Sequence, residues 1–391
     1  MSTVQRWSGR ETRALREALR MSIRAFAEHL GVNERTVTKW ESGGFGLRLR
    51  PDTQAMLDTA LAKTTAEAQA RFAESLQAED HTGVAAAQSS PITSHQPPSD
   101  TADELRERLA SSAAVDGRAL ALLAAQAEHI RRLDRMLGAR AAEAQLRGHL
   151  ETLSGLRRYA IVPSQREALA GLYADAAALA GWECLDLGDM ARAWHHYEGA
   201  KDAGREGQSS AGWVHATAEQ AYVLIELGET ASALQLAEYA RSVVQKEIPP
   251  LLLAWLWAVE GEAHAAAGND GPCRRAFEMA ERVLPADPHD PDLPYVVLGG
   301  VHLARWRGNA WARLGDREAI AELETALGGL DDTFTRARAG MHVDLAYALA
   351  ATRQETSARE QLQQGETLAI QVGSARQRRR IRHLESVLRA A

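Results

Sequence analysis

A glycine recurs at near-regular intervals in the C-terminal half of the chain, each time between two stretches with helical periodicity. The intervals are 40, 40 and 47 residues, and the glycines are Gly188, Gly228, Gly268 and Gly315. Seven residues before each of them stands a small residue, namely Gly181, Ala221, Gly261 and Gly308. A small residue lets two crossing helices approach closely, and a glycine turns left-handed without strain. The pattern therefore predicts an array of helix pairs.

This array resembles the tetratricopeptide repeat, whose usual period is about 34 residues. A fifth, weaker copy has Arg353 where the turn glycine would stand, and the run from Gln377 to Ala391 would close the array. Such repeats bury their apolar faces only by stacking on one another. The resemblance thus implies an α-solenoid with a concave surface that the first helix of each pair lines.

The positions expected on that concave surface combine aromatic, polar and basic side chains. The candidate effector-binding residues are Trp182, His215, Tyr222, Trp255, Glu262, His302, Arg305, Asn309, Arg313 and Tyr347. Apolar faces interspersed with hydrogen-bonding groups suit a peptide or a small amphipathic molecule. The alternative is that the aromatic residues pack between repeats as core, and the sequence leaves both interpretations open.

A second informative stretch lies near the N-terminus, in residues 22–43 (SIRAFAEHLGVNERTVTKWESG). Ser22 stands where it can cap a helix whose apolar residues recur at helical spacing. Gly31 is placed to end that helix, and Asn33 to cap a second one that turns Trp40 inward. Two short helices joined in this way present the outer face of the second to a groove.

At Ala27, Gly31, Val37 and residues 39–43, this stretch resembles the Xre family of helix-turn-helix regulators, which are related to the lambda-type phage repressors. The resemblance implies sequence-specific DNA binding, with Arg35 bidentate to a guanine edge and the threonines at phosphates or thymine methyl groups. The candidate DNA-binding residues are Ser22, Arg24, Asn33, Glu34, Arg35, Thr36, Thr38, Lys39, Arg48 and Arg50. The alternative is that these side chains only form a solvated helix face.

One position departs from the family, in which a DNA-contacting Gln often begins the first helix of the motif. Ile23 stands there, so Arg24 or Ser22 is expected to reach a phosphate instead. Arg48 and Arg50 end a glycine-rich loop just before Pro51, which suits the first turn of a helix. A helix N-terminus beside two arginines predicts a phosphate site, unless the loop is merely flexible and basic.

Charge and composition differ between the N-terminal segment and the rest of the chain. Residues 1–76 hold twelve Lys and Arg against nine Asp and Glu, whereas the remainder holds 33 against 43. This distribution fits DNA held by the N-terminal segment alone. Residues 77–103 are rich in Ser, Gln, Pro and Thr and predict a flexible linker. Residues 104–163 predict helices that serve either as a dimerisation element or as a cap on the repeat array of residues 164–391.

Three further groups have structural interpretations. Cys184 and Cys273 fall at packing positions of the array, so they are expected to be buried and unreactive. His264 is expected to be a hydrogen-bonded core histidine. The basic run of residues 376–382 is either a solvated helix face, a partner for the acidic remainder of the chain or a DNA contact.

Catalytic motifs are missing from the sequence. It has no G-x-x-x-x-G-K-[ST], G-x-S-x-G or H-E-x-x-H, and no Cys/His cluster with zinc spacing, so no enzyme, cofactor or metal is expected. Residues 1–20 lack an apolar core and no run approaches about 18 apolar residues, which predicts a cytoplasmic protein without a membrane partner. The predicted function is a transcriptional regulator that acts as a homodimer on an inverted-repeat operator in double-stranded DNA. The alternative is a scaffold whose repeats bind a protein partner.

Overall fold

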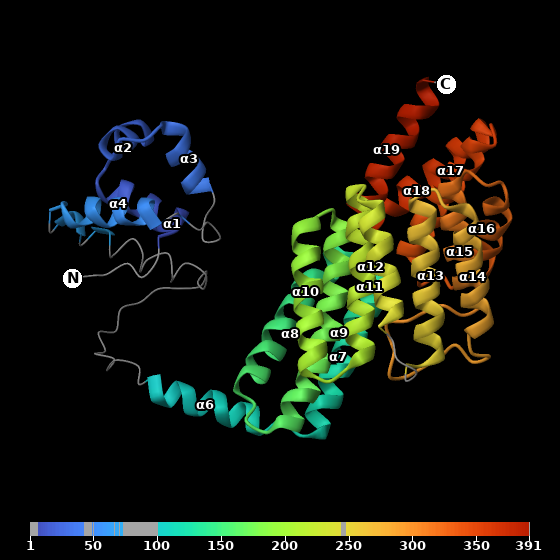
Figure 1. Cartoon of the computed structure of the whole chain (residues 1–391), viewed down its shortest axis with the longest axis horizontal. Coiled ribbons are helices and arrows are strands. Elements are labelled where there is room, and N and C mark those ends of the chain that lie inside the picture. Colours follow the sequence, from blue (N-terminus) through green and yellow to red (C-terminus); the bar gives the residue numbers. More distant parts are fainter. Residues whose placement is uncertain are drawn as a thin grey trace. The chain divides into compact units, whose positions relative to one another are not determined.

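The computed structural model describes residues 7–42, 49, 51–65, 67–69, 71–72, 101–243 and 248–390. All regular secondary structure in these residues is helical, which confirms the prediction of an all-α chain. The chain divides into two compact units, an N-terminal unit of residues 1–96 and a C-terminal unit of residues 97–391. Figure 1 shows the helices of both units.

The N-terminal unit contains α1 (Gly9–Ala18), α2 (Ile23–Leu30), α3 (Glu34–Ser42) and α4 (Pro51–Ala62). The Ser22 hydroxyl accepts the Ala25 N–H at 3.2 Å and so caps α2, while Gly31 ends it with a φ of 71°. The Asn33 side chain accepts the Arg35 N–H at 2.9 Å at the start of α3. Both predicted caps and the predicted turn are therefore confirmed. The buried core of the unit includes Trp7, Leu15, Phe26, Val37, Leu57 and Phe72.

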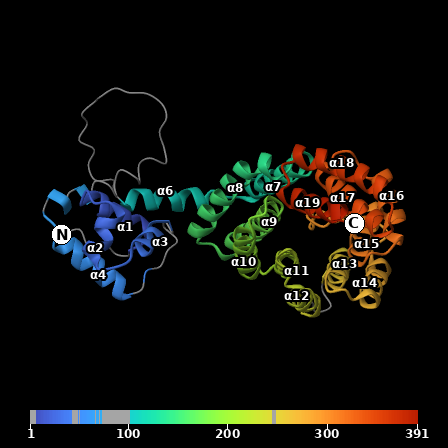
Figure 2. The same cartoon turned by 90° about the horizontal axis from the view of Figure 1, so that it is seen from above.

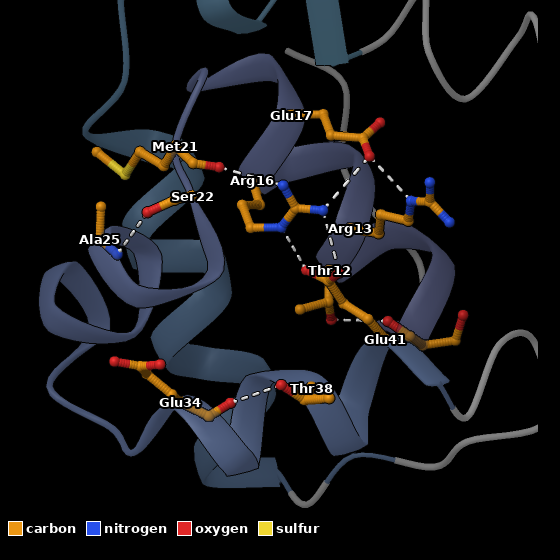
Figure 3. A network of polar contacts seen from close by, with 11 residues as sticks. Thr12, Arg13, Arg16, Glu17, Met21, Ser22, Ala25, Glu34, Thr38 and Glu41 are labelled. Carbon is orange, nitrogen blue, oxygen red and sulfur yellow. Dashed lines mark hydrogen bonds and ion pairs between the residues drawn. The ribbon is translucent and has the colours of Figure 1, made fainter.

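An ion pair fixes α3 against α1. Arg16 of α1 donates from Nε to Glu41 of α3 at 2.6 Å, and both side chains are less than one-fifth exposed. The same guanidinium donates to the Met21 carbonyl at 3.1 Å, in the turn before α2 (Figure 3). Because one side chain joins three segments, it sets the position of α3 relative to the rest of the N-terminal unit.

The C-terminal unit begins with α6 (Thr101–Ala113), α7 (Gly117–Leu137) and α8 (Ala139–Tyr159). Five successive helix pairs and a last helix follow. These are α9 (Pro163–Leu187) with α10 (Met190–Glu206), α11 (Ser210–Leu227) with α12 (Thr230–Ser242), α13 (Pro250–Ala266) with α14 (Asp270–Val283), α15 (Val301–Leu314) with α16 (Glu318–Gly329), α17 (Thr335–Ala351) with α18 (Glu355–Gln371), and finally α19 (Ala375–Ala390).

The turns within these pairs form where the recurring glycines predicted them. The four turn glycines have φ values of 83°, 81°, 76° and 73°, and Arg353 takes the corresponding turn of the fifth pair with a φ of 62°. The small residues also mark close approaches. A Cβ on Gly181 would lie 2.7 Å from the Tyr197 ring, and one on Gly261 would lie 2.6 Å from the Phe277 ring. A larger side chain at either position would separate the two helices of the pair.

The helices before the array pack into the C-terminal unit. Ile130 of α7 and Leu146 and Leu153 of α8 are buried in a core that they share with α9. This is the packing expected of a cap on the array, one of the two alternatives that the sequence left open. Dimerisation through the same segment stays a prediction.

The two ends of the array are joined, which the sequence did not predict. Asp134 of α7 is fully buried and accepts from Arg336 of α17 at 2.7 Å. Ser374, just before α19, donates to Asp186 of α9 at 2.6 Å. Viewed from above, α9 to α18 form an arc, and α7 and α19 lie between its ends (Figure 2). The expected open concave surface is therefore enclosed by α7 and α19.

Candidate functional site

The outer face of α3 is polar and exposed, whereas its inner face is apolar. Val37 is completely buried, and Glu34, Arg35, Thr38 and Lys39 are exposed. The Arg35 guanidinium makes no hydrogen bond or ion pair with any residue in the described part of the chain. The Thr38 hydroxyl donates to the Glu34 carbonyl at 3.0 Å, which leaves its oxygen lone pairs free to accept. The face can thus offer a guanidinium and short polar side chains to a ligand.

The remaining candidate DNA-binding residues differ in their exposure and in their contacts. Ser22 and Asn33 are exposed but use their side-chain oxygens as helix caps, and Thr36 is half-buried. Arg24 is three-quarters exposed and its Nε lies 3.7 Å from the Glu34 carboxylate, which places that carboxylate beside α2. Arg48 and Arg50 lie outside the described residues.

A cavity occupies the interior of the C-terminal unit, enclosed by the first helices of the pairs together with α7 and α19. It contains about 1380 Å³ of empty space, a volume that includes its open mouth. That room suits a small organic molecule or a few residues of a peptide.

Aromatic rings form a continuous wall of the cavity. Tyr222 lies edge-on to Trp182, with ring centroids 5.9 Å apart, and to Trp306, 6.0 Å apart. Trp306 in turn lies 6.3 Å from Trp255, and the His215 ring lies 4.7 Å from Trp255. The contacts among Trp182, Tyr222, Trp306 and Trp255 are thus edge contacts, whereas the His215 ring is tilted by 35° to that of Trp255, and all five residues line the cavity. Such a wall favours a flat apolar group.

Seven of the ten candidate effector-binding residues line this cavity. They are Trp182, His215, Tyr222, Trp255, Glu262, Arg305 and Asn309. The aromatic members agree with both interpretations that the sequence left open, because they line the cavity and also pack against one another.

The other three candidates lie elsewhere. His302 packs behind the lining, with its ring 4.9 Å from that of Phe334, and burial lowers its pKa to about 3. Arg313 is exposed, and its Nε donates to Asn309 at 3.3 Å. The Tyr347 hydroxyl donates to the Arg380 carbonyl at 3.0 Å and so binds α17 to α19. These three are therefore not among the residues that line the cavity with the other seven.

Several lining residues were missed because their helices were not expected at the inner surface. Those on α7 and α19 are Arg131, Asp134, Arg135, Arg376 and Arg380, and Tyr295 comes from the segment between α14 and α15. Others lie on helices that were expected there. Glu219 follows His215 by one helical turn, so the period of α11 could have identified it. Trp306 could have been found in the same way, because it precedes Asn309 by three residues on α15.

Ion pairs bind most of the lining charges. Arg131 donates to both oxygens of Asp175 at 2.6 and 2.7 Å, and Arg380 donates to Asp344 at 2.5 Å. Burial raises the pKa of Asp134 to about 6, although Arg336 beside it acts in the opposite direction. These pairs hold α7 to α9 and α17 to α19, so they define the walls of the cavity as well as its charge.

The basic run at the C-terminus serves mainly as a partner for acidic residues. Although burial alone would raise the pKa of Glu226, Arg376 at 2.7 Å lowers it to about 2. Arg379 donates to the same carboxylate at 2.9 Å. Of the three alternatives for this run, neutralisation of the acidic remainder is the one observed for these two residues.

The residues expected to be structural are buried as predicted, with one correction. Burial raises the pKa of Cys184 to about 11 and that of Cys273 to about 12, so neither thiol is activated. His264 was expected to be hydrogen-bonded, but its buried Nδ1 has no partner among the residues that the structure describes. Within the described ranges, no cluster of His, Cys, Asp and Glu has the arrangement of a metal site.

Comparisons with known proteins add no assignment. No protein-family model matches this sequence, and no curated protein matches it. Across the helices that the structure describes, none combines the length and apolar character needed to cross a membrane.

Proposed function

We propose that this chain is a sequence-specific DNA-binding transcriptional regulator whose C-terminal unit senses an effector. The observation that carries the proposal is the pair α2 and α3, with a capped start to each helix, a left-handed glycine between them and an exposed polar face on α3. This geometry supports the Xre-type helix-turn-helix that the sequence resembles. The alternative of a merely solvated face leaves the tight turn and both caps unexplained.

In this proposal α3 is the recognition helix and enters the major groove. The Arg35 guanidinium, which has no partner among the described residues, reads a guanine edge. Thr38 and Lys39 contact phosphates or bases, and Arg24 with Ser22 contacts the backbone from α2. The ion pair between Arg16 and Glu41 holds α3 at the angle that the groove requires.

The C-terminal unit, in this proposal, is a tetratricopeptide-like solenoid that dimerises the chain and binds a peptide or small-molecule effector. A dimer must place its two recognition helices about 34 Å apart, one turn of DNA. An effector can change this spacing only by its different affinity for two states of the solenoid. The enclosed cavity favours a small ligand over the long extended segment that a scaffold would bind, so the scaffold alternative receives less support.

The test is a genome-wide DNA pull-down with the wild type and with the double variant Arg35→Ala, Lys39→Ala. We expect the wild type to enrich an inverted repeat and the variant to enrich none. The matched control is Glu360→Ala in α18, an exposed residue of the C-terminal unit, which should enrich the same sites as the wild type. Absence of enrichment by the wild type, both alone and in extract of the native host, would refute the proposal.

A further inference from the structure

Two hydrogen-bond donors in the cavity wall are buried without acceptors. They are Nε1 of Trp182 and Nε1 of Trp306, and neither has a partner among the described residues. An indole N–H can only donate, and a buried donor without a partner costs free energy. Because the Tyr222 ring lies between the two tryptophans, both indole groups lie on one stretch of the wall. Together they indicate a ligand rich in acceptor atoms.

The cavity also has two guanidinium groups that form no ion pair within the described residues, those of Arg135 and Arg305. Arg131, Arg336 and Arg380 are paired with lining carboxylates, as described above. Arg135 lies over the Phe334 ring at 5.3 Å, and Arg305 lies over the Trp306 ring at 5.7 Å. Neither of these two forms an ion pair with a residue that the structure describes. A guanidinium stacked on an aromatic ring keeps its N–H groups, which lie in its own plane, available to an anion.

None of the acidic groups that remain in the lining forms an ion pair with Arg135 or Arg305 among the described residues. Glu219 accepts from the Tyr197 hydroxyl at 2.9 Å, and burial raises its pKa to about 7. Burial also raises the pKa of Glu262, although Arg313 acts in the opposite direction. Asp186 has one oxygen engaged by Ser374. Its other oxygen and one of Asp134 have no partner in the part of the chain that the structure describes, but both carboxylates lie at the seam where α7 and α19 meet the array. The wall formed by Trp182, Tyr222 and Trp306 thus offers indole N–H donors beside a guanidinium that forms no ion pair with a described residue.

We propose that the cavity binds a small planar aromatic carboxylic acid, whose ring lies among Trp182, Tyr222 and Trp306 and whose carboxylate pairs with Arg305. The flat group matches the aromatic wall, and the carboxylate matches the unpaired guanidinium and the free indole N–H groups. The cavity, with about 1380 Å³ of empty space including its mouth, has room for a ring system of this kind. This inference rests on the proposed function, because it names the effector of the sensing unit.

The test uses three probes of one shape on the full chain. These are 2-naphthoate, the neutral 2-naphthamide and the cationic 2-naphthylmethylammonium, and their dissociation constants are measured by isothermal titration calorimetry. We expect the acid to bind more tightly than the amide by about 10- to 100-fold, the usual worth of a hydrogen-bonded charge pair. We expect the cation to bind weakest.

Arg305→Met should weaken binding of the acid by a similar factor and leave the amide unchanged. The matched control is Arg378→Met, an exposed arginine of α19 that does not line the cavity, which should change neither. The proposal is overturned if the cation binds as well as the acid, or if Arg305→Met weakens the acid and the amide equally. A peptide ending in Phe with a free carboxylate that binds while 2-naphthoate does not would overturn it as well.

Binding of these probes is measured without DNA, so its failure is distinct from failure of the proposed function. If 2-naphthoate binds through Arg305 but the pull-down enriches no site, the proposed ligand class is supported and the proposed role as a DNA-binding regulator is refuted. If an operator is found but all three probes bind alike, DNA recognition stands and this ligand class is refuted.

Discussion

Gly138 lies where α7 gives way to α8, at the seam that closes the cavity. Its φ of 85° and ψ of 169° belong to a region that essentially only glycine enters, so an alanine there is strained by about 1–3 kcal/mol. A Cβ would also lie 1.9 Å from the Val372 carbonyl oxygen, between α18 and α19. Forcing those segments apart adds about 1–3 kcal/mol. Gly138→Ala should therefore destabilise the C-terminal unit by about 2–6 kcal/mol.

Gly228→Ala is the matched control, since its φ is 81° but no atom lies within 4 Å of the Cβ position. It should cost only the left-handed strain of about 1–2 kcal/mol. Urea unfolding followed by tryptophan fluorescence reports on the C-terminal unit, because seven of the nine tryptophans lie in residues 97–391. Amide exchange in α7 should accelerate in Gly138→Ala and not in Gly228→Ala. If both variants lose the same free energy of unfolding and the amides of α7 are equally protected from exchange in both, closure of the array is refuted.

Two further predictions concern ionised groups. Glu183 is buried with one oxygen unpartnered, and burial raises its pKa to about 9, so the wild type should lose stability as pH rises from about 4.5 to about 9. Glu183→Gln removes this loss, so its free energy of unfolding relative to that of the wild type should rise by up to about 5 kcal/mol from pH 5 to pH 9; parallel pH profiles of the two proteins in thermal unfolding would contradict this. Glu41→Gln breaks the buried pair with Arg16, so thermal unfolding should show the N-terminal unit destabilised by about 1–3 kcal/mol. The control is Glu17→Gln, at an exposed carboxylate, which should change the stability of this unit by less than about 0.5 kcal/mol.

The features of the fold that the sequence predicted are local ones. A turn glycine and the small residue seven positions before it act within a single helix pair, so their spacing predicted the pairs without knowledge of their neighbours. Even Arg353, which replaces a glycine, occupies the turn at the predicted position. The caps of α2 and α3 were predictable for the same reason, because each involves residues two or three positions apart.

The candidate site was predictable where helical periodicity decides which face points inward. Periodicity did not identify lining residues at His302, Arg313 and Tyr347. His302 lies in the first turn of α15, where its ring packs against that of Phe334 and does not enter the lining. Tyr347 faces α19, whose position against α17 has no local signal. Arg305 and Glu262 were found from their register alone, but their state of charge depends on burial that no sequence pattern reports.

The two walls supplied by α7 and α19 were missed because their contacts span most of the chain. Arg336 and Asp134 are 202 positions apart, and Ser374 and Asp186 are 188 apart. Neither segment carries a motif that names its partner. The segment containing α7 was predicted to be helical, but only the folded structure shows that its arginines face the cavity.

Closure of the array has a consequence for the time course of biosynthesis. In an open solenoid each repeat can fold as it leaves the ribosome, because it contacts only its neighbours. Here the partner of Asp134 emerges 202 residues later, which at about 5–20 residues per second is roughly 10 to 40 s. Until then the aromatic wall has no lid, and α19, which is made later still, completes it. A nascent chain is thus unable to retain a ligand before α19 has been made, and a chain truncated within residues 375–390 lacks the intact α19 that closes the wall.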